Sequence, residues 1–168
     1  MKREQEIQET VESIVTFDGT TIRFRGMFPA SKTPHNWDLD WTDIRLITEC
    51  WLFGGPGATH EITFRDEVGK AFHIGGEDQG LGEMLKGLST ALSYHVECSL
   101  PRPTETGEPA KCQPQSTLVL WPPQLAGEPC YEKVRRPHWF PPCRWLNRPG
   151  EYGLDCTQKV KDYLDKEA

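Results

Sequence analysis

The sequence has no long hydrophobic run. No segment approaches the roughly 20 consecutive apolar residues that a membrane-spanning helix needs. The first residues, MKREQEIQETVES, also lack the apolar stretch that follows the basic residues of a secretory signal. We therefore expect a cytoplasmic protein that does not enter a membrane.

Motifs that identify common enzymes are also missing. There is no Gly-x-Ser-x-Gly, no phosphate-binding Gly-x4-Gly-Lys-Ser/Thr, no His-Glu-x-x-His and no Cys-x-x-Cys. We therefore expect a protein with no catalytic residues and no cofactor. Two enzymatic alternatives stay open: a hydrolytic group of His35, Asp38 and Asp40, and a nucleophilic Cys143 with His138 or His95.

Proline and cysteine are scarce before residue 97 and common after it. Residues 1–97 contain 3 of the 14 prolines and 1 of the 6 cysteines, and their net charge is −7. Residues 98–168 contain the other 11 prolines and 5 cysteines, and their net charge is +1. This change predicts an acidic α+β domain over 1–97 and a Pro/Cys-rich extension over 98–168 that packs on it.

The cysteines lack the spacing of a zinc site. Such sites usually bring two ligands close together, as in Cys-x2-Cys, whereas the five cysteines of the extension follow one another at intervals of 14, 18, 13 and 13 residues. His138 and Cys143 form the tightest candidate pair. Because cytosolic thiols normally stay reduced, we expect free thiols and no metal, with zinc and disulfides as the alternatives.

Alternation of apolar and polar residues predicts strands over 11–17, 20–28, 43–53, 59–65 and 70–74. The first two are joined by Asp18-Gly19, which favours a two-residue hairpin turn with positive φ at both positions. The third is apolar on both faces and should lie in the middle of a sheet. The last two form a second hairpin.

The period changes from 2 to 3.6 after these strands. A helix is expected over 78–97, with Asp78 as its N-cap and with one apolar stripe made of Leu81, Leu85, Leu88, Leu92 and His95. A histidine on such a stripe is expected to be packed and hydrogen-bonded.

These elements run from Trp41-Thr42-Asp43-Ile44, through the hairpin ITFRDEVGKAFHI, to the helix GLGEMLKGLSTAL. In this order, over about residues 11–97, the chain resembles the pleckstrin-homology-like (PH-like) superfold in its bacterial or GRAM-like form. The resemblance implies a bent antiparallel sheet of about five to seven strands closed by one amphipathic helix. A flat sheet backed by one helix is the alternative.

Domains of this superfold serve as scaffolds for binding lipids, peptides or proteins. The phosphoinositide-binding members carry basic residues around the first hairpin loop, but here that loop contains Asp18, and only Arg23 and Arg25 stand nearby. Anionic membranes also repel a domain with a net charge of −7. We therefore do not expect a membrane partner.

The extension contains two further regular segments. Residues 116–121, STLVLW, read as a single strand that pairs with an edge of the preceding sheet. Asp155 and Gln158 have the spacing of a capping box. They predict a short helix over 155–167 that packs on the body.

Residues 133–148, KVRRPHWFPPCRWLNR, combine five basic residues with three aromatic ones and contain no acid. Arginine and tryptophan are enriched at the energetic centres of interfaces. The stretch predicts a partner-binding surface made of Arg135, Arg136, Trp139, Phe140, Arg144 and Trp145. The alternative is that it docks on the acidic domain of its own chain.

The sequence thus favours a non-enzymatic, cytoplasmic protein-binding module. A net charge of −6 argues against nucleic acid as the partner and suits a bacterial inhibitor or immunity protein that captures a basic protein. The alternatives are a metal- or thiol-dependent enzyme that uses cysteines and histidines of the extension, and a lipid-binding PH-like domain.

Overall fold

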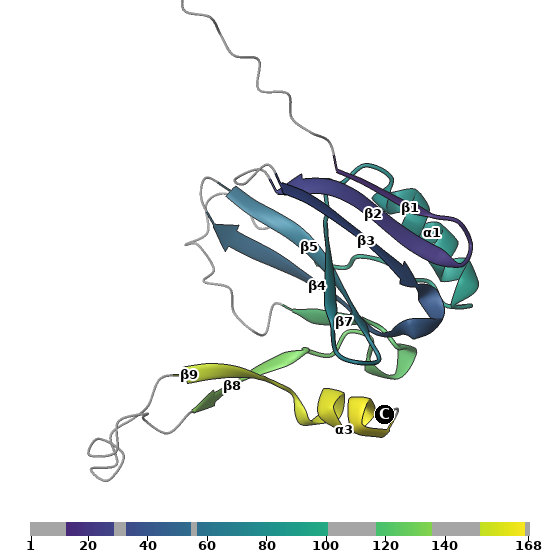
Figure 1. Cartoon of the computed structure of the whole chain (residues 1–168). Coiled ribbons are helices and arrows are strands. Elements are labelled where there is room, and N and C mark those ends of the chain that lie inside the picture. Colours follow the sequence, from purple (N-terminus) through teal and green to yellow (C-terminus); the bar gives the residue numbers. More distant parts are fainter. Residues whose placement is uncertain (1–12, 29–32, 55–56, 101–116, 136–151, 167–168) are drawn as a thin grey trace, which may run out of the picture.

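The computed structural model describes residues 13–28, 33–54, 57–100, 117–135 and 152–166 and has an α+β fold (Figure 1). Its strands are β1 Ile14–Phe17, β2 Thr21–Phe28, β3 Thr33–Asp40, β4 Ile44–Gly54, β5 Gly57–Asp66, β6 Ala71–Gly75, β7 Leu118–Trp121, β8 Tyr131–Arg135 and β9 Tyr152–Cys156. The α-helices are α1 Leu81–Ala91 and α3 Gln158–Lys166, and short 3-10 helices span Trp41–Asp43 and Pro123–Leu125.

The strands form three antiparallel sheets. Their orders are β1-β2-β3, β6-β5-β4-β7 and β8-β9. The predicted α+β class, with antiparallel strands, one amphipathic helix after them and a short helix near the C-terminus, is confirmed. No helix within the described ranges is long and apolar enough to cross a membrane.

The first hairpin is confirmed, but its turn differs from the prediction. Gly19 has a φ of +98°, whereas Asp18 does not have a positive φ. The carboxylate of Asp18 accepts hydrogen bonds from the backbone N–H groups of Thr20 and Thr21, each at 2.9 Å. Asp18 therefore stabilises a longer loop through its side chain, as aspartate often does in turns.

Strand β3 lies in a stretch for which the sequence analysis predicted no strand. Its alternation is masked by turn-type residues, among them Pro34 and Asp38. Proline is tolerated because β3 is an edge strand, where one row of N–H groups has no ladder partner. Leu39 is buried on one face, and Asp38 pairs on the other with Arg25 at 2.6 Å.

Strand β4 lies between β5 and β7, which confirms the central position predicted for residues 43–53. The prediction that residues 116–121 add a strand to an edge of the preceding sheet is also confirmed, because β7 pairs with β4 through Thr48 and Val119. The division of the chain at residue 97 stays a prediction.

Helix α1 is shorter than predicted and starts differently. Its N-cap is Gly80, with a φ of +87° and no side-chain cap, so the prediction of an Asp78 cap is wrong. The carboxylate of Asp78 instead accepts a 2.7 Å hydrogen bond from the Gly75 N–H. His95 lies beyond the helix with 79% of its side chain exposed, next to Glu97, so its predicted packing is also wrong.

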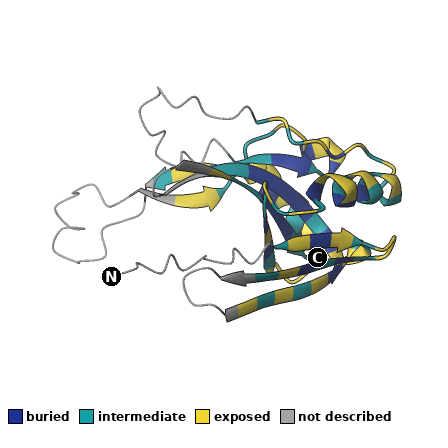
Figure 2. Ribbon diagram, turned by 90° about the horizontal axis from the view of Figure 1, so that it is seen from above, coloured by how far each residue is buried: buried dark blue, intermediate teal, exposed yellow. Residues whose placement is uncertain are grey.

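Two buried clusters hold the fold together. The larger one joins the two main sheets to α1 and includes Ile22, Phe64 and Leu88, each fully buried. Figure 2 shows the alternation of buried and exposed residues along α1, which places one face against this cluster. The smaller cluster joins β4 and β7 to the C-terminal elements through Leu46 and Val160.

The C-terminal part consists of the two-stranded β8–β9 ribbon followed by α3, which lie beside β7 in Figure 1. The helix starts at Gln158, and Asp155 lies in β9, where it pairs with Lys161 at 2.8 Å. The predicted capping box is therefore wrong. The amide of Gln158 binds Asp162 one turn further on.

Candidate functional site

A fully buried carboxylate lies at the centre of β4. Oxygen Oε1 of Glu49 accepts three hydrogen bonds, from the Ser99 N–H at 2.8 Å, the Ser99 hydroxyl at 2.8 Å and the Leu100 N–H at 3.0 Å. A buried charge is costly unless such partners compensate for the lost water. Oε1 of Glu49 therefore holds Ser99 and Leu100, which follow directly on the first 97 residues and Cys98, against strand β4.

The second oxygen of Glu49 faces a histidine. Nε2 of His60 lies 3.2 Å from Oε2 of Glu49. The β4–β5 register pairs Glu49 with Ile62 and Trp51 with His60, so the two side chains are diagonal neighbours on one face of the sheet. The Trp51 and His60 rings pack with centroids 4.9 Å apart.

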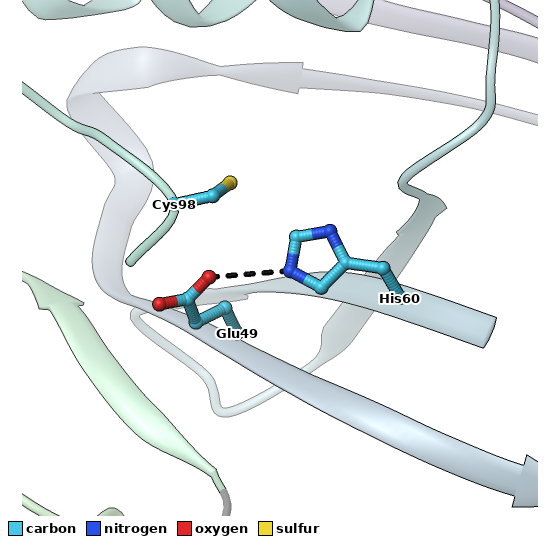
Figure 3. A group of neighbouring side chains, drawn as sticks. All are labelled: Glu49, His60 and Cys98. Atoms are coloured by element: carbon cyan, nitrogen blue, oxygen red, sulfur yellow. Dashed lines mark hydrogen bonds and ion pairs between the residues drawn. The ribbon is translucent and has the colours of Figure 1, made fainter. Parts of the chain in front are cut away.

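Cys98 completes this group from a third segment. Its sulfur, a nitrogen of His60 and an oxygen of Glu49 all lie within 4.8 Å of one another. Figure 3 shows the three side chains entering the same space from β4, β5 and the loop after α1. Burial, reinforced by the negative charge of Glu49, raises the pKa of the Cys98 thiol to about 11.

The donor atoms of this Glu49–His60–Cys98 cluster are those of a soft or borderline metal site: one carboxylate, one imidazole and one thiol. Cys98 also lines a hollow of about 760 Å³ between α1 and residues 93–98.

A signal for the cluster was present in the sequence, because Glu49 stands inside a strand that is apolar on both faces. The sequence did not indicate that the segments carrying Glu49, His60 and Cys98 contact one another.

A second polar group lies between β5 and β6. Nδ1 of His73 lies 3.0 Å from Oε1 of Glu61, and both residues line a pocket of about 350 Å³ with His35 and Asp78. The hydrogen bond to Glu61 raises the pKa of His73, and the same bond lowers the pKa of Glu61. Burial raises the pKa of Asp78. The sequence analysis did not predict this group.

The acids of the hydrolytic site considered for His35, Asp38 and Asp40 bind other residues in the structure. Asp38 pairs with Arg25, and Asp40 accepts a 2.5 Å hydrogen bond from the Thr21 hydroxyl. Both acids thus make local contacts between strands.

Two cysteines meet at the base of the β8–β9 ribbon. The Cys130 thiol is fully buried and hydrogen-bonded to Cys156, which lowers the pKa of Cys156 and raises that of Cys130. Nearby Arg65 lowers the pKa of Cys156 further. Cys50, Cys98, Cys130 and Cys156 form no disulfide in the part of the chain that the structure describes, and the prediction that they bind no metal stays a prediction; Cys112 and Cys143 lie outside the described residues.

The predicted partner-binding residues are only partly within the described ranges. Arg135 is the last residue of β8, where its backbone pairs with Tyr152 of β9. The remaining five, Arg136, Trp139, Phe140, Arg144 and Trp145, belong to the connection 136–151 and lie outside the described residues, as does the His138 and Cys143 pair.

Comparison of this chain with protein families, with curated proteins and with solved structures gives no match. The resemblance to the PH-like superfold stays a prediction.

Proposed function

We propose that this protein is a non-enzymatic protein-binding module of the cytoplasm. Its partner surface is formed by six residues, Arg135, Arg136, Trp139, Phe140, Arg144 and Trp145, of which the last five belong to the connection 136–151. The observation that supports this proposal is the pairing of Arg135 with Tyr152, because these two residues, which flank the connection, lie side by side at one end of the β8–β9 ribbon.

The other end of the ribbon is anchored in the protein. The Thr157 N–H donates a 3.0 Å hydrogen bond to the Cys130 carbonyl, and both Cys130 and Val160 belong to the smaller buried cluster. Within the described ranges, neither β8 nor β9 pairs with a strand of another sheet. A ribbon held at its base keeps its own two strands in a fixed arrangement, which lowers the ordering cost of binding at the ribbon.

The residue types of this surface suit a protein partner. Arginine and tryptophan contribute strongly at the centres of protein interfaces. The whole chain has a net charge of −6, so long-range attraction speeds its encounter with a positively charged protein. An inhibitor or immunity protein that neutralises its partner is the particular role that we propose.

Lipid binding is less well supported. The two arginines beside the first hairpin are engaged by acids: Arg23 pairs with Asp18 at 2.5 Å and Arg25 pairs with Asp38 at 2.6 Å. A phosphate group would have to displace these carboxylates. We therefore do not propose a phosphoinositide as the ligand.

Affinity capture from native lysate tests the protein-binding proposal. The test variant carries Arg135→Ala, Arg136→Ala, Trp139→Ala and Trp145→Ala, and the control carries Lys86→Ala and Lys166→Ala on exposed faces of α1 and α3. Circular dichroism first establishes that both variants fold. We expect one near-stoichiometric protein with the native chain and the control, and its loss with the test variant. Capture that is unchanged in the test variant would contradict the proposed surface.

A further inference from the structure

The buried carboxylate of the Glu49–His60–Cys98 cluster contacts both other members of the cluster. Oε1 of Glu49 accepts three hydrogen bonds, Oε2 lies 3.2 Å from Nε2 of His60, and the Cys98 thiol donates a hydrogen bond to the carboxylate. The Glu49 side chain is fully buried. Buried charges of this kind are paired with other groups or coordinate metals.

The spacing of the donor atoms agrees with a tetrahedral metal ion. Zinc binds imidazole nitrogen and carboxylate oxygen at about 2.1 Å, which places two such ligands about 3.4 Å apart on the edge of a tetrahedron. The separation between His60 Nε2 and Glu49 Oε2 is 3.2 Å. The strand register sets this spacing, because the two residues are diagonal neighbours on β4 and β5.

The sulfur ligand needs a small adjustment. A zinc-bound thiolate lies about 3.6 Å from the other ligands, and the sulfur of Cys98 is within 4.8 Å of them. Cys98 lies in the segment after α1, outside helix and strand. Because 4.8 Å is the upper limit of the separations in the cluster, the sulfur has to move by at most about 1 Å relative to the other two ligands.

We propose that Glu49, His60 and Cys98 form a binding site for a zinc ion. Thiolate and imidazole ligands favour zinc over magnesium or calcium, which prefer oxygen alone. Binding releases the thiol proton of Cys98 to solvent and requires the ring proton of His60 to stay on Nδ1. The three residues leave a fourth position for water.

The surrounding contacts are suited to orienting these ligands. The hydrogen bonds from Ser99 and Leu100 hold the Glu49 carboxylate through Oε1 and leave Oε2 for the metal. The indole N–H of Trp51 donates a 3.4 Å hydrogen bond to the Leu100 carbonyl, while its ring packs on His60. The ion would therefore link β4 and β5 to the first residues of the extension.

Metal titration of the full chain tests this site. The protein is first treated with a chelator, and zinc is then added in competition with a chromogenic chelator; we expect one equivalent to bind. Cys98→Ser and His60→Gln should each weaken zinc binding by more than about 100-fold, whereas the matched controls Cys50→Ser and His73→Gln should stay within about threefold of the native protein.

Cobalt provides a second readout that reports the sulfur ligand directly. Bound cobalt should give a cobalt–thiolate charge-transfer band, which Cys98→Ser abolishes and Cys50→Ser retains. Zinc binding by the native chain that is clearly substoichiometric would overturn the proposal. Equal zinc affinity or an unchanged cobalt band in Cys98→Ser would also overturn it, because the ion would then lie elsewhere.

Discussion

Cys98 and Cys156 are both partly buried thiols, yet their surroundings have opposite effects. The Glu49 carboxylate next to Cys98 adds to the effect of burial and raises its pKa to about 11. Cys156 receives a hydrogen bond from Cys130 and lies near Arg65, so its pKa is lowered. The thiolate is the reactive form of cysteine, and the two residues should therefore differ in reactivity.

We expect iodoacetamide at pH 7, with chelator present, to modify Cys156 at least about tenfold faster than Cys98. The two rates can be measured from the corresponding peptides by mass spectrometry. In guanidinium chloride both residues lose their surroundings, and the rates should converge. Equal rates in the native protein would show that the two environments do not differ as described.

His73 and Glu61 form a pair in which the pKa of the histidine is raised and the pKa of the carboxyl is lowered. The raised pKa of His73 means that its bound proton stabilises the folded state fully below pH 6.5 and that this contribution is lost as the pH rises through the raised value. The lowered pKa of Glu61 means that its contribution is present above pH 4.5 and is lost at lower pH. The pair therefore contributes most between these values.

His73→Gln should lower the midpoint of thermal unfolding near pH 6, and the difference from the native protein should disappear near pH 9. The effect should stay below about 1 kcal/mol, because 51% of the His73 side chain is exposed and solvent screens the pair. Added salt should reduce it further. A difference that is constant across the whole pH range would contradict this explanation.

At the scale of elements, the start of α1 is determined by backbone contact. A Cβ on Gly80 would lie 2.3 Å from the Val15 carbonyl oxygen, and the φ of +87° is unfavourable for any side chain. Gly82, two residues further on, has nothing within 4 Å of its Cβ position. Gly80 is the N-cap of α1 and Gly82 lies in its first turn, so the two glycines allow a matched comparison at the start of one helix.

Gly80→Ala should destabilise the protein by about 2 kcal/mol or more, because it combines a steric overlap with backbone strain. Gly82→Ala should stabilise it by up to about 1 kcal/mol, since alanine is the better helix former. Urea unfolding of both variants gives the comparison. Equal effects of the two substitutions would show that the contact with β1 does not determine where α1 begins.

The elements that the sequence predicted are those with a strong local pattern. Hairpin 59–74 has a clear apolar period and central strand β4 is apolar on both faces, whereas β3 carries polar turn-type residues on an edge strand. β8 and β9 were not predicted because a two-stranded ribbon buries little, so its residues need not alternate; Leu154, for example, is 50% exposed. A local pattern predicts a strand only where the residues that face the core are apolar along most of the strand.

For the molecule as a whole, the sequence predicted that residues 116–121 join the preceding sheet but not which side chains of distant segments meet. Glu49 and His60 are 11 residues apart on paired strands, but Glu49 binds Ser99 across 50 positions. An acidic residue inside an apolar strand, such as Glu49, indicates that other groups of the protein hydrogen-bond to its carboxylate. The sequence does not indicate which groups these are. The partner-binding surface remains a sequence-based proposal, because five of its six residues lie outside the described ranges.

The smaller buried cluster determines whether the chain unfolds as one unit. Leu46 of β4 packs in this cluster with Val119 and Val160, while its neighbours Ile44 and Ile47 on the same strand belong to the larger cluster. Because one strand belongs to both clusters, loss of either should be transmitted to the other. We therefore expect a single unfolding transition for the described parts of both halves of the chain.

Val160→Ala tests this coupling. The substitution removes two methyl groups from a fully buried site and should cost about 2 kcal/mol, while Val68→Ala at a side chain that is 80% exposed should change stability by less than about 0.5 kcal/mol. Urea unfolding followed by both far-ultraviolet circular dichroism and tryptophan fluorescence should give coincident curves with an unchanged slope. If Val160→Ala instead produced an early, separate transition, α3 and the ribbon would form an independent unit, and the smaller cluster would not connect them to β4.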